Sequence, residues 1–376
     1  MHIFDKFVHS ISVVLLQNQL LGTTTLTISN RKFQKSKPRT IFILIAMSLF
    51  LVFAALVFYQ KIYLANNTVL YKSTDVILII INSIYVIAVW LHALFNSDKF
   101  SHLLNAIITF DRNLYQFGDG VDYTKQRKRD LLESTIRYTV VVFTVVSFLV
   151  IRVYICGEEL LFELLRDVLL LIKSVTCHQA VQLVSIIKTR LEILNKHLRE
   201  LLDSEDNPRR KNGRKFKTLC KICDMHHHLI KINKLFNKTF GMLLLVMFGL
   251  SFVTTVLCFF YISASVQTAE TDWQHGTLAI ILSIPFLGDV VYVCNVCYKT
   301  VEEAHLIGEL IHKIETEDED VIDEVEMFSL QIYNGPIEFS AAQFFAIDHT
   351  LIFSIIGGIT TYIIILIQLS STLLAK

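Results

Sequence analysis

The sequence predicts an all-α polytopic membrane protein with seven transmembrane helices. Of the 376 residues, 53% are hydrophobic and only 18% are charged, and the mean hydropathy is +0.51. Soluble domains carry about 25% charged residues, and here the apolar surplus lies in blocks near the ~20 residues that a helix needs to cross a bilayer. No phosphate loop, nucleophile elbow or HExxH motif occurs, so we expect no enzyme and no cofactor.

Seven apolar blocks define the expected spans. We place them at about 40–60, 75–95, 136–156, 164–187, 239–262, 277–298 and 348–372. Ahead of them, the apolar stretch from Phe4 to Leu21 is interrupted by polar residues. It predicts an amphipathic helix at the membrane surface rather than a signal peptide or a span. The expected domains are a cytosolic segment 1–39, spans 40–187, a cytosolic extension 188–238, spans 239–298, a cytosolic anchor 299–347, and the seventh span with a short extracellular tail, 348–376.

The basic residues indicate how the chain lies in the membrane. They gather before the first span, in the loop after the second and in the loop after the fourth, and the loop 263–276 has none. Because Lys and Arg mark cytosolic loops, the N-terminus is expected inside and the C-terminus outside. The sequon at Asn66 then falls outside and predicts glycosylation, whereas the one at Asn237 falls inside and should be silent.

Apolar periodicity continues past the membrane in three places. Leu191, Leu194 and Leu198 keep helical spacing after the fourth span, and we expect this helix to run to about Ser204 and break near Pro208. The residues before the fifth span and those after the sixth also keep apolar residues at helical spacing. These extensions must pack on one another, on a short helix around 322–332, or on another subunit.

The seventh span carries the most specific pattern, a Thr361-Tyr362 pair followed by five aliphatic residues and then Gln368. It resembles the C-terminal signature of insect gustatory receptors: Thr-Tyr, five hydrophobic residues and Gln-Phe. The likeness extends upstream through 328–331, 336–341 and 344–348, and the rest of the chain matches in layout only. Leu369 stands where the family usually has Phe.

The resemblance implies a ligand-gated, non-selective cation channel in the plasma membrane of sensory neurons. In that family the pore forms between four identical or related subunits, and the seventh helix is split into a cytosolic anchor and a pore-lining part. The ligand would be a small-molecule tastant, either a bitter or plant compound or a sugar; Ile363 stands where sugar receptors often carry Glu. No nucleic-acid partner is expected.

On this reading, one face of the seventh helix lines the pore. Residues at i, i+3/i+4 and i+7 share a helical face, and an aliphatic constriction can gate by dewetting. The alternative is an ordinary buried helix with Gln368 bonded to a neighbour. The glycines 357 and 358 and Pro285 in the sixth span suit close approach or bending. The expected pore and gate residues are Thr361, Tyr362, Ile364, Ile365, Gln368 and Leu369.

A ligand pocket is expected in the outer half of the bundle formed by spans two to six, where aromatic and polar residues gather. Taken singly, each of these residues is better explained as an interfacial anchor or a member of an internal ion pair. Asp289, deeper in the sixth span, has no obvious partner. The candidates are Asp75, Tyr85, Arg152, Tyr154, Arg166, Asp167, Lys173, Tyr261 and Trp273.

Two alternative functions and a possible metal site remain open. A seven-span receptor acting through G proteins would have the opposite orientation, and a transporter would usually show an internal repeat, which we do not find. The run from Cys220 and Cys223 to His226–His228 resembles half of a zinc site. Since a second ligand pair is missing, a solvated helix surface is preferred.

Overall fold

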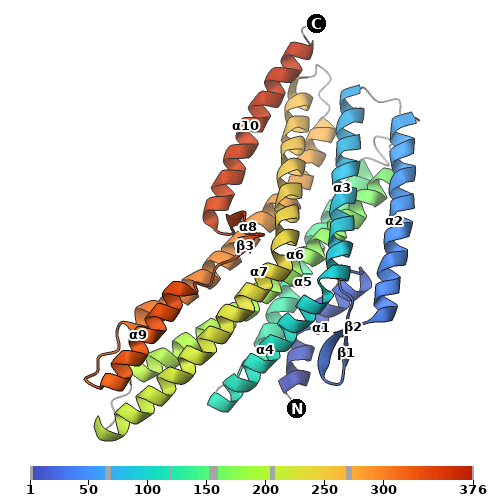
Figure 1. Ribbon diagram of the computed structural model, residues 1–376. Helices are drawn as coiled ribbons and strands as arrows, with labels where there is room; N and C mark the ends of the chain where they lie inside the picture. Colours follow the sequence, from blue (N-terminus) through green and yellow to red (C-terminus); the bar gives the residue numbers. More distant parts are fainter. Residues whose placement is uncertain are drawn as a thin grey trace.

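The structure is a computed structural model that describes residues 3–63, 69–118, 120–151, 160–203, 208–267 and 273–374. Within these ranges the chain is almost entirely helical, with two short β-hairpins. Figure 1 shows the N-terminus at the bottom and the C-terminus at the top. The elements are α1 (Ile3–Leu20), β1 (Leu26–Ser29), β2 (Lys32–Lys35), α2 (Lys37–Tyr63), α3 (Val69–Phe95), α4 (Ser97–Phe117), α5 (Tyr123–Phe148), α6 (Leu160–Asp203), α7 (Pro208–Gln267), α8 (Trp273–Ile311), α9 (Glu319–Asn334), β3 (Ser340–Ala341), β4 (Phe345–Ala346) and α10 (His349–Leu374).

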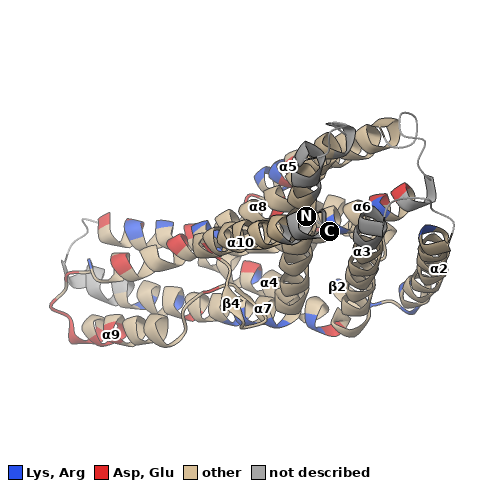
Figure 2. Ribbon diagram, turned by 90° about the horizontal axis from the view of Figure 1, so that it is seen from above, with Lys and Arg blue, Asp and Glu red and all other residues tan. Residues whose placement is uncertain are grey.

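The described residues contain six helices long and apolar enough to cross a membrane, and a seventh, shorter apolar stretch at His349–Ile365 in α10. They fall at the seven predicted positions, so the all-α fold class is confirmed. The seventh helix is split as expected, because α9 and the apolar α10 are separated by the β3–β4 hairpin. Figure 2 shows acidic residues gathered on and beside α9, whereas α10 is uncharged.

The extensions of the fourth, fifth and sixth spans form a second bundle, in the lower half of Figure 1. As predicted, α6 ends close to Ser204, at Asp203. The next helix, α7, already begins at Pro208, where only a break was expected. In this lower bundle α8 packs along both α6 and α7, and α9 packs on α7. Leu191, Leu194 and Leu198 are fully buried there, so their apolar stripe is covered by the chain itself.

The region between the second and third spans differs from the prediction. Residues 97–117 form a helix, α4, rather than a loop, and α5 begins at Tyr123, well before the predicted start at 136. The Asp122 carboxylate caps α5 by accepting hydrogen bonds from the backbone N–H groups of Thr124 and Lys125, both at 3.0 Å. The hydroxyl of Thr124 also donates to Asp122, and this hydrogen bond lowers the pKa of the carboxyl group. The basic residues placed in this loop therefore lie on the first turns of α5.

Asp111 joins α4 to α5 and α6. Its carboxylate accepts hydrogen bonds from Nε and Nη2 of Arg190 on α6, at 3.0 and 2.7 Å. The hydroxyl of Tyr123 donates to it at 2.8 Å, and both ionic side chains are almost fully buried. Buried charges are tolerated only when paired and hydrogen-bonded in this way.

The predicted N-terminal helix forms, and its apolar face is covered by protein. Phe7, Ile11 and Val14 are buried where α1 packs on α5, α6 and α4. The amide of Gln17 donates to the hydroxyl of Ser134 at 2.6 Å. Leu20 remains 67% exposed, so only the end of α1 presents an apolar surface.

Candidate ligand cavity and pore helix

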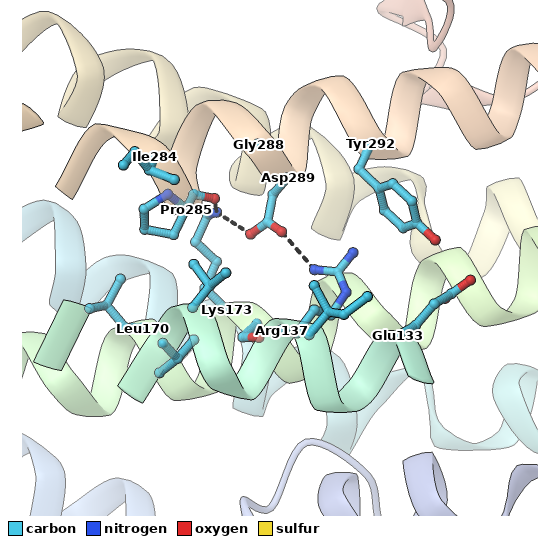
Figure 3. Close-up of a pocket in the computed structure, with 13 residues that line it drawn as sticks. Glu133, Arg137, Leu170, Lys173, Ile284, Pro285, Gly288, Asp289 and Tyr292 are labelled. Carbon is cyan, nitrogen blue, oxygen red and sulfur yellow. Dashed lines mark hydrogen bonds and ion pairs between the residues drawn. The ribbon is translucent and has the colours of Figure 1, made fainter. Parts of the chain in front are cut away.

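A cavity of about 270 Å³ lies between α5, α6 and α8 (Figure 3). Its size is near the lower end of the range for small-molecule sites, about 300–1,000 Å³. The surface of the lining is mostly apolar, and Arg137, Lys173 and Asp289 meet near its centre (Figure 3). The lining residues are Glu133, Ile136, Arg137, Val140, Val141, Leu170, Lys173, Ser174, Ile284, Pro285, Gly288, Asp289 and Tyr292.

Three charged residues in this lining form one network. The Asp289 carboxylate accepts from Arg137 Nη1 at 2.6 Å and from Lys173 Nζ at 2.5 Å. Lys173 Nζ also donates to the carbonyl of Pro285 at 3.1 Å. Asp289 therefore has two partners, and the expectation that it lacked one is wrong. The partners come from α5 and α6, on the opposite side of the cavity from α8, so the network ties all three helices together.

Aromatic rings complete the environment of the two cations. Lys173 Nζ lies 4.5 Å from the ring centroid of Phe286, and the Arg137 guanidinium lies 5.0 Å from that of Tyr292. A cation near a ring face gains about 0.5–2 kcal/mol, more when water is excluded. Because Lys173 is only 1% exposed, this ring and the carboxylate replace the hydration that the ammonium lost.

A second charge cluster lies further along α6, toward its start. Arg166 pairs with Glu163 one turn away and with Asp167 at 2.8 Å. The Arg166 guanidinium also sits 3.6 Å from the Phe148 ring centroid of α5. All three charged side chains are buried, and none of them lines the cavity.

The predicted ligand residues are therefore divided by the structure. Lys173 lines the cavity, whereas Arg166 and Asp167 belong to the second cluster and Tyr85, buried in α3, is not part of the lining. Residues Arg152, Tyr154 and Asn66 lie outside the described chain, as do the side chains of Asp75, Tyr261 and Trp273. The cavity is also deeper than expected, because Asp289 lies past the middle of the sixth predicted span.

Sequence reasoning missed Arg137 as a site residue, and with it Glu133 and Tyr292. The signal for Arg137 was present: it stands at the start of a predicted span, and a charge within a span is functional by default. Its partner Asp289 is 152 positions away, so no local pattern could join the two.

The α10 helix packs on α7 and α8 along one side and leaves the opposite side open. Ile364 and Ile365 are each 51% exposed and Tyr362 is 52% exposed, and Thr361 and Gln368 are exposed as well. The Tyr362 ring meets Phe252 of α7 edge-on at 5.7 Å between centroids. The side chain of Leu369 lies outside the described part. An exposed side of this kind is what a pore-lining helix would present.

Contacts at its start fix the position of α10. The Asp348 carboxylate caps the helix by accepting from the backbone N–H groups of Thr350 and Leu351 at 2.8 and 3.3 Å. The His349 ring stacks on Tyr298 of α8, with centroids 4.1 Å apart and planes at 21°. This stack joins the helix that carries Asp289 to the first residue of α10.

The hairpin before α10 is held tightly to α7. The Asn237 amide donates to the carbonyl of Glu338 at 2.7 Å, and its oxygen accepts from Ser340 N at 3.2 Å. A Cβ added at Gly241 would lie only 2.8 Å from the backbone nitrogen of Ala342. Glycine is therefore required where the hairpin backbone meets α7. The sequon asparagine Asn237 has a structural role here.

The cysteine and histidine run on α7 is solvated only in part, because His227 and His228 are exposed whereas Cys223 and His226 are not. Cys223 and His226 are buried against α9, where Cys223 Sγ lies 3.4 Å from Gln331 Oε1 and the His226 ring meets that of Phe328 at 5.3 Å. Within the described part of the chain, no group of three or more His, Cys, Asp or Glu residues could hold a metal ion. The run forms part of the α7–α9 interface.

The family follows from comparison with known proteins. Residues 11–373 match the family model described as 7tm Chemosensory receptor. The chain belongs to this chemosensory receptor family. Its resemblance to insect gustatory receptors is thereby confirmed, and this is a family of receptors rather than of enzymes.

Individual relatives agree with the family. The chain is 28% identical over 154 residues to "Gustatory receptor for bitter taste 66a" of Drosophila melanogaster, covering 39% of this chain and 29% of that protein. It is 24% identical over 185 residues to "Gustatory receptor 68a" of the same organism, covering 48% and 46%. The matched part of the chain thus spans less than half the length of each relative.

Solved structures show the same fold. The insect olfactory receptor OR5 from Machilis hrabei superimposes with a TM-score of 0.73 at 13% identity, covering 98% of this chain and 100% of that chain. The same receptor in complex with eugenol gives a TM-score of 0.66 at 12% identity. At these identities the similarity establishes the fold of the chemosensory receptor.

Proposed function

We propose that this receptor is a gustatory receptor: a subunit of a ligand-gated, non-selective cation channel in the plasma membrane of sensory neurons. A small organic tastant opens it, and the pore lies between four identical or related subunits. The observation that carries the proposal is the exposed side of α10, with Thr361, Ile364, Ile365 and Gln368. A helix side that is aliphatic over most of its length and polar at Thr361 and Gln368 suits the wall of a pore with a hydrophobic constriction.

The pore face combines an aliphatic stretch with a polar end. Ile364 and Ile365 give a ring that excludes water when the helices are close, which is how a hydrophobic constriction closes a pore. Leu369, in place of the Phe usual in the family, is the proposed plug. Separation of the four α10 helices would let water and cations pass Gln368.

The cavity between α5, α6 and α8 is the proposed ligand site. Its mostly apolar surface and its polar cluster suit a small organic molecule, and a receptor of the same fold was solved in complex with eugenol. A ligand that wedges against Asp289 or Tyr292 would displace α8. The Tyr298–His349 stack would pass this displacement to α10.

Whole-cell patch-clamp recording from cells that express the chain alone tests the proposal. The cells receive sugars and plant alkaloids while GDP-β-S in the pipette blocks G proteins. We expect rapid cation currents that persist under the block and are lost in Tyr298→Ala but kept in the conservative Tyr298→Phe. Currents abolished by GDP-β-S, or saturable flux without channel openings, would contradict the proposal and favour a G-protein-coupled receptor or a transporter.

A further inference from the structure

The cavity opens on the outside of the helix bundle, through a gap between α5 and α8. Ile136 of α5 is 56% exposed and Ile284 of α8 is 52% exposed, and both line the cavity. Leu170, Lys173 and Ser174 of α6 are buried and form its floor. α8 packs closely along α6 but contacts α5 much less, which leaves the gap.

The surface around this gap is apolar on both helices. On α5 the exposed residues continue with Phe143 and Val146, at 59% and 51%, and on α8 with Ile280 and Val291, at 52% and 46%. Both stretches belong to helices long and apolar enough to cross a membrane. Side chains of this kind face lipid chains, which are as apolar as leucine. The gap therefore opens into hydrocarbon, and a molecule that passes it comes from the bilayer.

The interior selects for one polar group on an otherwise apolar molecule. Val140 and Val141 of α5 add apolar surface to the lining. The Arg137–Asp289–Lys173 network forms a polar cluster near its centre (Figure 3). A permanent charge is excluded, because carrying an ion through hydrocarbon costs several kcal/mol or more. A neutral hydroxyl, carbonyl or ether could hydrogen-bond to this network after crossing.

We propose that ligands enter this cavity sideways from the lipid bilayer, between α5 and α8, and that they are small, neutral, membrane-partitioning amphiphiles with one hydrogen-bonding group. The inference deepens the proposed function and rests on it for the role of the cavity as the ligand site. The size of about 270 Å³ limits the occupant to a small molecule.

Gly288 offers a way to close the gap without disturbing the fold. It lines the cavity, and a Cβ added there meets nothing within 4 Å. Gly249 on α7 is a matched control, since it is also an exposed helical glycine whose added Cβ meets nothing within 4 Å. Gly288→Leu should fill the entrance, whereas Gly249→Leu should leave it unchanged.

Photolabelling of the full chain in phosphatidylcholine nanodiscs tests the proposal. The probe is azioctanol, a neutral diazirine alcohol that partitions into bilayers, and its adducts are located by mass spectrometry. We expect adducts on the floor residue Leu170, reduced about tenfold or more in Gly288→Leu, the scale on which apolar pockets discriminate small volume changes. Gly249→Leu should match the wild type.

Two results would overturn the proposal. One is labelling of Leu170 at a similar yield by a membrane-impermeant diazirine that carries a quaternary ammonium, which means entry from water. The other is adducts on Ile136 and Ile284 with none on the floor of the wild type, which means that the gap is closed or occupied by an acyl chain. Both use the wild type, so they stand even where Gly288→Leu fails to fold.

Recording currents from the same variants separates this inference from the proposed function. Labelling that follows the expected pattern, together with tastant currents unchanged in Gly288→Leu, would support lateral entry and would refute the cavity as the activating ligand site. Tastant currents weakened only in Gly288→Leu would support both.

Discussion

Replacing Asp289 with asparagine should destabilise the receptor far more than replacing either of its partners. Asn keeps the shape of the side chain and removes its charge, which leaves Lys173 and Arg137 facing each other with no counter-charge between them. Lys173 is 1% exposed and Arg137 12% exposed at the side chain, so water cannot substitute for the carboxylate. Removing one partner of a buried ion pair typically costs about 3–5 kcal/mol.

The Lys173→Met variant provides the comparison. It removes one cation and leaves the Arg137–Asp289 pair at 2.6 Å, and methionine fills the space of the lysine stem. A volume-conserving change of this kind usually costs less than about 1.5 kcal/mol. The free energy of unfolding of Asp289→Asn should thus be at least about 1.5 kcal/mol lower than that of Lys173→Met. This corresponds to more than tenfold in the equilibrium constant of unfolding.

The assay is reversible unfolding of the purified receptor in mixed micelles against the mole fraction of SDS, followed by circular dichroism. Equal losses in Asp289→Asn and Lys173→Met would refute the reasoning, because they would mean that the two cations do not depend on one carboxylate. An Asp289→Asn variant within about 1 kcal/mol of the wild type would refute it too, since a buried pair would then have no measurable value.

Three further predictions concern contacts outside the cavity. Gly241→Ala should lower the free energy of unfolding by about 1–3 kcal/mol, because the added Cβ meets the hairpin backbone, whereas Gly249→Ala should stay near the wild type. Equal values for the two variants would contradict the close approach of α7 and the hairpin. Asp111→Asn should cost about 3–5 kcal/mol in the same assay by leaving Arg190 buried without its counter-charge, and a neutral result would contradict the pair. The Asp122 cap should protect the Thr124 and Lys125 amides from hydrogen exchange above an ordinary aspartate pKa of about 3.9, and this protection should fall as the pH drops through the lowered folded pKa. Asp122→Asn keeps a capping oxygen without titrating there, so a pH dependence that survives this change would contradict the assignment.

The sequence predicted the features that depend on local pattern. Apolar blocks located the spans because lipid-facing helices must be apolar over ~20 residues, and Pro208 marked the break after α6 because proline disrupts a helix interior. α4 was missed although its signal was present: Leu103, Ile107 and Leu114 are buried on one face at helical spacing. A shorter, less hydrophobic helix between two spans was taken for a loop.

The cavity could not be predicted, for a physical reason. Lys173 and Arg137 meet Asp289 across sequence separations of 116 and 152 residues, and the pairing is decided by how three long helices pack. Periodicity reports which face of a helix is buried, but it does not report which helix covers that face. Arg166 and Asp167 illustrate the limit, because both are unusual charges in a span and they pair mainly within α6.

The most direct test of the central claim asks whether α10 lines a pore that opens with ligand. Thr361→Cys and Ile365→Cys receptors would be recorded by patch clamp while the positively charged thiol reagent MTSET is applied with and without tastant. Ser48→Cys, on an exposed side of α2, and the wild type serve as controls. The account predicts irreversible block at both α10 positions, fast in the open state, and none in the controls. Ligand-evoked currents that are unaffected at both α10 positions would contradict it.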